Sequence, residues 1–153
     1  YKYIVKEFKK KGYIFDEVWA LMPCSPLINY KDLIKISLFS KKSKTKIPIL
    51  STSKYRVPIQ WSYKMQPNKV LKPINHKYHN IRSQDLPLRY YETGQFVIYP
   101  SKYLDNLKNK SKKVDFLGYV LPSIKSIDID DVDDWKLAEI SYKNLKKNYK
   151  SHF

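Results

Sequence analysis

The sequence predicts an α/β domain with a mainly parallel sheet. Helical and strand-like segments alternate over the first third of the chain, which is the order expected of strands joined by crossover helices. The apolar runs Glu17–Met22 and Gly94–Tyr99 are short and nearly continuous, as in strands that are buried on both faces. With 153 residues, 42% of them hydrophobic, we expect a single domain over residues 1–153.

The first third of the chain predicts four elements. Gly12 suits the end of an amphipathic first helix, Pro23 ends the first strand, and Asn29 or Asp32 is a suitable N-cap for the second helix. In chain order we expect a helix at 2–11, a strand at 17–22, a helix from Asn29 or Asp32 to the lysine run that starts at Lys41, and a strand at 47–53.

Residues 55–87 interrupt this alternation. They contain four prolines, Pro58, Pro67, Pro73 and Pro87, which is too many for an uninterrupted helix. We expect an inserted arm of short strands, with residues 60–66 as one strand.

After the arm, the chain is expected to return to the main sheet and its helices. We expect a strand at 94–99, a short helix at 101–107, a strand from Gly118 to Leu121, and a long final helix. Asp131 and Asp134 are placed to cap that last helix. Its apolar residues have the spacing of one buried stripe, formed by Trp135, Ala138, Tyr142 and Leu145.

The composition limits the possible functions. One cysteine, Cys24, allows neither a disulfide framework nor a cysteine-built zinc site, so we expect a reducing, cytoplasmic location. No apolar run approaches the length of about 20 residues that a membrane-spanning helix needs. The three glycines stand too far apart for a glycine-rich phosphate loop. The chain begins at Tyr1 in what reads as the middle of a helix, so we expect the domain to be N-terminally incomplete.

A net charge of +16 raises the alternative of a polyanion-binding protein. Only three of the 30 basic residues are arginines, Arg56, Arg82 and Arg89, whereas specific base and phosphate recognition favours the guanidinium group. The lysines form runs, which are usually solvated surface, at 9–11, 41–46, 108–113 and 146–150. We therefore expect no specific nucleic-acid partner and no membrane partner.

Five of the 14 acidic residues lie within residues 128–134. We expect Asp131, Asp133 and Asp134 to serve the cap of the final helix. Asp128 and Asp130 alternate with isoleucines, so an extended chain would place both carboxylates on one face with Cα atoms about 6.5 Å apart. Two such carboxylates suit Mg²⁺ with phosphate and water oxygens as further ligands, although on the pattern alone they are equally explained as part of the cap.

Six segments of the chain form a recognisable series. In chain order they are Leu21–Leu27 (LMPCSPL), Pro58–Gln60 (PIQ), Arg82–Pro87 (RSQDLP), Thr93–Phe96 (TGQF), Ser126–Asp130 (SIDID) and Asp134–Glu139 (DWKLAE). Together they resemble the acylneuraminate cytidylyltransferase family, and the combination of PIQ, RSQDL and GQF is more similar to its pseudaminic acid branch than to its sialic acid branch.

The resemblance implies a Rossmann-like nucleotide-sugar transferase fold, here the C-terminal two-thirds. The implied reaction joins CTP to a nine-carbon acidic sugar, giving the CMP-sugar and pyrophosphate. Asp128 and Asp130 match the family's metal pair, which implies Mg²⁺ as cofactor. The arm is implied to form a homodimer, with the sites near its interface.

The resemblance also implies substrate-binding residues. Arg82 and Gln84 match positions that contact the acidic sugar, although Arg82 alternatively pairs with Asp85 in a structural ion pair. The amides of Gln60 and Gln95 either bind sugar hydroxyls or satisfy loop backbone. Ser25 follows the strand at 17–22 and is expected to face the cleft.

Two questions stay open at this point. None of His76, His79 and His152 is a clear general base, so the catalytic residue is left unassigned. The alternative to an enzyme is a truncated, non-catalytic relative that serves as a sugar-binding or dimerisation module.

Overall fold

The computed structural model describes residues 1–107 and 114–150, the last four of these (147–150) by backbone alone. The lysine run at 108–113 and His152 lie outside the described residues. The helices and strands, in chain order, are α1 (Lys2–Lys10), β1 (Glu17–Leu21), α2 (Tyr30–Ser43), β2 (Ile49–Lys54), β3 (Tyr63–Met65), β4 (Leu71–Pro73), β5 (Tyr90–Pro100), α3 (Ser101–Asn106), β6 (Leu117–Val120) and α4 (Val132–Lys150).

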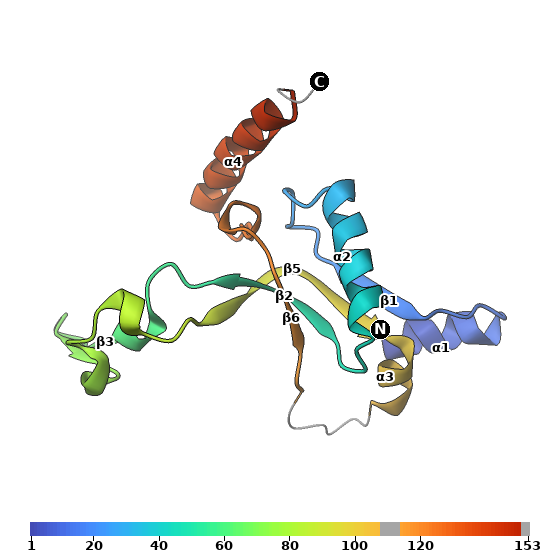
Figure 1. Cartoon of the computed structure of the whole chain (residues 1–153), viewed down its shortest axis with the longest axis horizontal. Helices are drawn as coiled ribbons and strands as arrows, with labels where there is room; N and C mark the ends of the chain where they lie inside the picture. Colours follow the sequence, from blue (N-terminus) through green and yellow to red (C-terminus); the bar gives the residue numbers. More distant parts are fainter. Residues whose placement is uncertain (108–113, 151–153) are drawn as a thin grey trace.

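The α/β class is confirmed, and the expected elements are present with ends shifted by a few residues. Four strands form the body in the order β1-β5-β2-β6, and β3 and β4 form a separate two-stranded sheet in the arm (Figure 1). Among the described residues, no helix is both long and apolar enough to cross a membrane.

The expectation of a mainly parallel sheet is wrong. β5 pairs antiparallel with both β1 and β2, and only β2 and β6 pair in parallel. The helix α2 does return the chain so that β1 and β2 point the same way, as strand–helix alternation predicts. However, β5 is reached through the arm and not through a crossover helix, and it inserts between them in the opposite direction.

The body's core lies between α2 and the sheet. It contains Ile36 of α2 together with Ile49, Phe96, Ile98 and Leu121, each at most 4% exposed. Asn29 is the N-cap of α2, and Asp32 completes a capping box by accepting from the Asn29 backbone N–H at 3.0 Å. Both residues that the sequence offered for this helix start are therefore used.

A β-bulge interrupts β5 beside β2. The register shifts between Leu50 and Thr52, and the extra residues of β5 include Gly94, whose φ is +65°. The hydroxyl of Ser51 accepts from the backbone N–H groups of Gln95 (3.2 Å) and Phe96 (3.0 Å). The backbone N–H groups of Gln95 and Phe96 are thus satisfied inside the fold.

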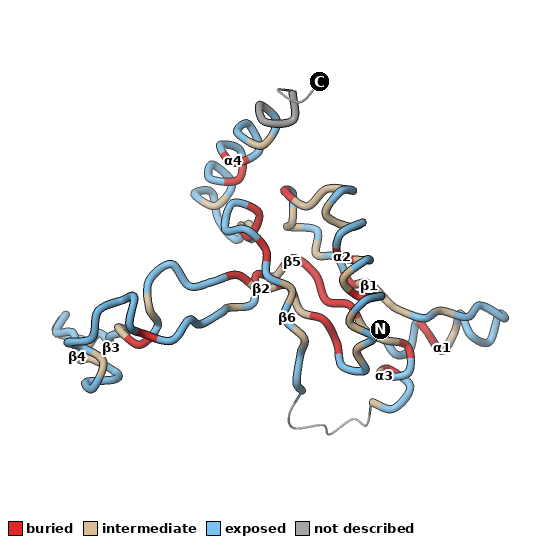
Figure 2. The backbone as a smooth tube through the Cα atoms, in the orientation of Figure 1, coloured by how far each residue is buried: buried red, intermediate tan, exposed pale blue. Residues whose placement is uncertain are grey.

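The arm, residues 55–87, extends away from the body (Figure 1). At its base Tyr55 N–H donates to the Arg89 carbonyl at 3.1 Å, and inside it the Trp61 indole donates to the Tyr78 carbonyl at 3.1 Å. Most of its surface is exposed (Figure 2). That surface includes exposed apolar side chains, namely Val57, Ile59, Met65, Val70, Leu71 and Ile74.

The cap of α4 is confirmed, but its buried stripe is not. Asp131 accepts from the Asp133 and Asp134 backbones, both at 2.9 Å, and Asp134 accepts in return from Asp131 at 3.3 Å. In the expected stripe Ala138 is 5% exposed, whereas Trp135 and Tyr142 are 58% and 54% exposed. The physical reason is that α4 points away from the sheet (Figure 1), so no layer closes over the stripe.

Candidate functional site at the bulge of strand β5

The segment 126–130 connects a short 3-10 turn, η4 (Ser123–Lys125), to α4. It is not a strand, so the expected two-residue alternation does not set its side-chain directions. Asp128 is partly buried and Asp130 is exposed. The two carboxylates therefore differ in environment, and the packing of Asp128 defines the site.

Asp128 lies directly against Gly94 of the bulge. A Cβ atom at Gly94 would be 2.2 Å from Oδ2 of Asp128, which no real side chain tolerates. The φ of +65° at the same residue is also one that favours glycine. Both the backbone angle and the contact with Asp128 therefore require glycine here.

Buried oxygens without partners gather around this contact. Among the described residues, five buried side-chain oxygens have no hydrogen-bond partner, and three of these belong to Thr93, Gln95 and Asp128. For Asp128 the atom is Oδ1. A buried carboxylate oxygen without a donor is costly, so it marks a place where a cation or a water completes the structure.

The thiol of Cys24 is the neighbour of Asp128 on the other side. Its hydrogen bond to the Asp128 carboxylate raises the thiol pKa, and desolvation and the negative charges of Asp128 and Asp130 raise it further. A thiol held in its neutral form is a poor nucleophile. The raised pKa therefore makes Cys24 an unsuitable nucleophile at this site.

The oxygen atoms available as metal ligands at the site fit Mg²⁺. This ion prefers oxygen ligands and is usually held by one or two carboxylates, with phosphate and water oxygens as the others. Oδ1 of Asp128, which has no partner, and the carboxylate of Asp130 are oxygens of this kind. Within the described part of the chain, no three acidic, histidine or cysteine side chains lie together as a group that could hold a metal ion by itself.

Two more of the sequence-predicted residues join Asp128. The Ser25 hydroxyl donates to the Gln95 carbonyl at 3.2 Å, which places it beside the bulge. The Gln95 side chain is fully buried, and its Nε2 donates to the carbonyls of Thr93 (2.9 Å) and Ile127 (3.1 Å). For Gln95 the contacts thus favour the backbone-supporting alternative.

The arm carries the other predicted residues. Arg82 makes an ion pair with Asp85 at 2.8 Å, with its side chain 73% exposed, and Gln84 is exposed in the same turn. Gln60 is buried, and its Nε2 donates to the Pro87 carbonyl at 3.1 Å. In the described part of the chain, no hydrogen bond or ion pair joins the arm to 126–130, so the chain itself does not bring the two groups together.

A buried ion pair lies next to the carboxylate segment, and the sequence did not predict it. Lys125 Nζ lies 2.6 Å from both carboxylate oxygens of Asp32, and the two side chains are only 10% and 13% exposed. The pair joins the start of α2 to the turn that precedes Asp128. Its members stand 93 positions apart in the chain, and no local pattern links them.

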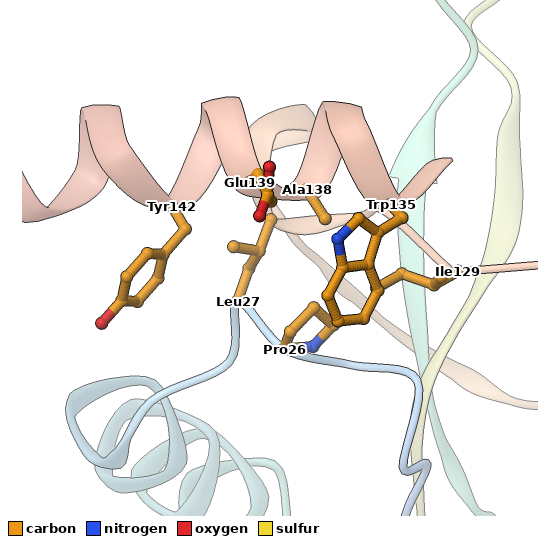
Figure 3. Close-up of a pocket in the computed structure, with 7 residues that line it drawn as sticks. All are labelled: Pro26, Leu27, Ile129, Trp135, Ala138, Glu139 and Tyr142. Carbon is orange, nitrogen blue, oxygen red and sulfur yellow. The ribbon is translucent and has the colours of Figure 1, made fainter. Parts of the chain in front are cut away.

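An apolar groove of about 200 Å³ adjoins the carboxylate segment (Figure 3). It runs between α4 and the loop after β1, and the rings of Trp135 and Tyr142 lie along it. Its other lining residues are Pro26, Leu27, Ile129, Ala138 and Glu139. The sequence had assigned the two aromatic residues to a closed core.

No family model matches the chain. Pseudaminic acid cytidylyltransferases from Campylobacter jejuni serotypes O:2 and O:23/36 are each 27% identical to it over 150 residues, or 97% of this chain. The resemblance to the cytidylyltransferases is confirmed. The match is distant, and the chain spans 62% of the length of these two enzymes.

Proposed function

We propose that this chain forms the metal- and sugar-binding part of a cytidylyltransferase that activates a nine-carbon acidic sugar of the pseudaminic or sialic type. Asp128 carries the proposal, because its carboxylate packs through Oδ2 on Gly94 of the bulge while its other oxygen, Oδ1, is buried and has no partner, within segments that match such enzymes. We further propose that the mixed sheet is part of a Rossmann-like nucleotide-sugar transferase fold.

In this proposal Asp128 and Asp130 hold Mg²⁺. When bound there, the ion would neutralise negative charge on the phosphates of CTP and on the attacking sugar oxygen. Asp128 contributes a carboxylate already oriented by Gly94 and Cys24, and the exposed Asp130 contributes one that can adjust to the substrate. The residues present thus act by alignment and charge compensation.

The arm would supply recognition of the acidic sugar. The Arg82 guanidinium is exposed and is the right shape for a carboxylate, although it would exchange its partner Asp85 for the sugar. Gln84 in the same turn and Ser25 beside the bulge would contact sugar hydroxyls. Gln60 and Gln95 have their amide nitrogens on backbone carbonyls, so their part is to shape the loops.

A homodimer would unite the two halves of the site. The arm exposes an apolar surface, and Arg82 and Gln84 have no bond to the described carboxylate segment of their own chain. A twofold pair of chains would cover that surface and bring each arm to the partner's carboxylates. The site would then be composite, with Asp128 from one protomer and Arg82 from the other.

The proposed setting is the cytoplasm, where a lone thiol such as Cys24 stays reduced. CTP and the sugar are the proposed partners, with no specific nucleic acid or membrane. Because the related enzymes are longer, we propose that their additional length includes a CTP-binding segment, that transfer requires it and that this chain alone is inactive.

The test is pyrophosphate release from CTP and Mg²⁺ with pseudaminic acid or sialic acid. It compares this chain with the same chain joined to the N-terminal part of one of the Campylobacter enzymes. We expect activity in the joined protein, its loss in Asp130→Asn, and its retention in Asp133→Asn, because Asp133 is an exposed acid paired with Lys136. A folded, joined protein that is silent with both sugars would contradict the proposal.

A non-catalytic sugar-binding or dimerisation module is the second candidate. It is favoured by the fact that the chain carries the arm and the carboxylate segment but spans 62% of the related enzymes. This candidate predicts a dimer that binds the sugar and releases no pyrophosphate in the joined protein.

A further inference from the structure

Gln95 is held in a fixed place by the bulge of β5. Its backbone N–H donates to the Ser51 hydroxyl, and its carbonyl accepts from Met22 N–H at 3.0 Å and from the Ser25 hydroxyl. The side chain is fully buried. Neither its backbone nor its amide has freedom to move without breaking these bonds.

The amide nitrogen of Gln95 donates two hydrogen bonds, both to backbone carbonyls. One bond, to Thr93, stays within the bulge, and the other reaches Ile127, 32 residues further along the chain. Within the described residues this is the sole hydrogen bond to the backbone of residues 127–129. The Gln95 side chain thus supplies the hydrogen bond that ties the backbone of this segment to the sheet.

The bond to Ile127 bears directly on Asp128. The Ile127 carbonyl and the Asp128 N–H belong to one planar peptide unit, so an anchored carbonyl oxygen restricts the orientation of the whole unit. That orientation sets the direction in which the Asp128 side chain leaves the backbone. Gly94, which Asp128 touches, is the residue just before Gln95.

We propose that Gln95 is a positioning residue for the carboxylate of Asp128. Its amide fixes the peptide unit, and the adjacent Gly94 leaves the space into which the carboxylate is directed. The inference rests on the proposed metal site, because orientation matters only if Asp128 has a ligand to meet. Removal of a group that orients a metal ligand typically weakens metal binding about 10–100-fold.

Calorimetric titration of the full chain with Mn²⁺ tests this, with thermal melting of every variant. Gln95→Met keeps a buried chain of similar length and loses both donors, and we expect a dissociation constant about 10–100-fold higher than that of the unchanged chain. The matched control is Gln60→Met. Gln60 is also buried, donates to a backbone carbonyl and has an unpartnered oxygen, but it lies in the arm. It should lower the melting temperature and leave Mn²⁺ affinity within about twofold, since Gln60 bonds to Pro87 within the arm, and the arm's proposed part is to meet the sugar and not the ion.

Two results would overturn the inference. An unchanged Mn²⁺ affinity in Gln95→Met overturns the role of Gln95 and leaves the proposed metal site standing. A chain without measurable Mn²⁺ affinity overturns both. If Gln95→Met does not fold, Gln95→Leu, which also lacks the two donors and adds no charge, is judged by the same threshold.

Discussion

The two buried glutamines show how differently the body and the arm are built. Gln95 and Gln60 are both buried, both donate to a backbone carbonyl, and both leave Oε1 without a partner. Gln95 lies in the buried bulge, and the residues around it that have unpartnered oxygens include Thr93 and Asp128. Gln60 lies in the arm, which has exposed apolar side chains. The body thus holds the proposed metal-binding half of the site in a fixed arrangement. The arm, by contrast, needs a second surface to cover its exposed apolar side chains.

The largest expected effect comes from filling the space beside Asp128. Gly94→Ala puts a Cβ 2.2 Å from Oδ2 of Asp128 and forces the carboxylate to move, so we expect activity of the joined protein and Mn²⁺ affinity of the chain to fall about 100-fold. The control is Gly12→Ala, which carries the same positive-φ strain, with φ +87° and no atom within 4 Å of the new Cβ. Pyrophosphate release and Mn²⁺ titration measure the difference. Equal losses in both variants would mean that strain alone, and not the contact with Asp128, is responsible.

Substitutions on the arm should weaken the association of two chains. Replacing Val57, Met65 and Ile74, which are 63%, 64% and 60% exposed, with serine removes apolar surface that we expect to be covered in a dimer. The dimer dissociation constant should rise at least about 100-fold, since the buried apolar anchors of an interface carry most of its free energy. Sedimentation velocity measures this.

A matched control for the arm is Leu38→Ser on α2, an apolar residue with the same 63% exposure outside the arm. It should leave association unchanged. A chain that sediments as a monomer before any substitution would refute the account of the arm.

The buried Lys125–Asp32 pair should contribute more to stability than the exposed Lys9–Asp105 pair. Lys125→Met leaves Asp32 buried without its partner, so the free energy of unfolding should fall by about 3–5 kcal/mol. Lys9→Met breaks the exposed pair with Asp105, whose side chains are 37% and 49% exposed, and should cost at most about 1 kcal/mol. Urea unfolding compares the two variants. Similar losses in the free energy of unfolding would show that burial of the Lys125–Asp32 pair does not increase its contribution to stability.

Arg82 gives the smallest expected change in stability. Its ion pair with Asp85 is exposed, so Arg82→Ala should change the free energy of unfolding by less than about 1 kcal/mol. If the residue binds the acidic sugar, the KM for that sugar should nevertheless rise in the joined protein. A large loss of stability with an unchanged KM would assign Arg82 a structural role.

Local patterns in the sequence predicted most of the fold. Asn29 and Asp32 at the start of α2, and Asp131 and Asp134 at the start of α4, are caps that act within four residues. Such signals depend on nearby atoms alone, so they were read correctly. The direction of β5 depends on how the arm returns the chain, which no local pattern encodes.

The site was predictable in part for the same reason. The alternation of acids and isoleucines pointed to Asp128 and Asp130, but not to the Gly94 contact or to the Lys125–Asp32 pair, because both depend on long-range packing. Trp135 was assigned to the core because its spacing is that of a buried stripe. Spacing shows which residues share a face and does not show whether another layer covers it.

The most direct measurement of a site shared between two chains is complementation between two defective joined proteins. Asp128→Asn lacks the metal ligand and Arg82→Ala lacks the sugar contact, so at a sugar concentration well below the raised KM of Arg82→Ala each variant alone should release little pyrophosphate. After the two are mixed and allowed to exchange subunits, half of the dimers are mixed and each contains one intact site, so about a quarter of full activity should return. If mixed dimers form and pyrophosphate release does not recover, Asp128 and Arg82 do not act together across the dimer.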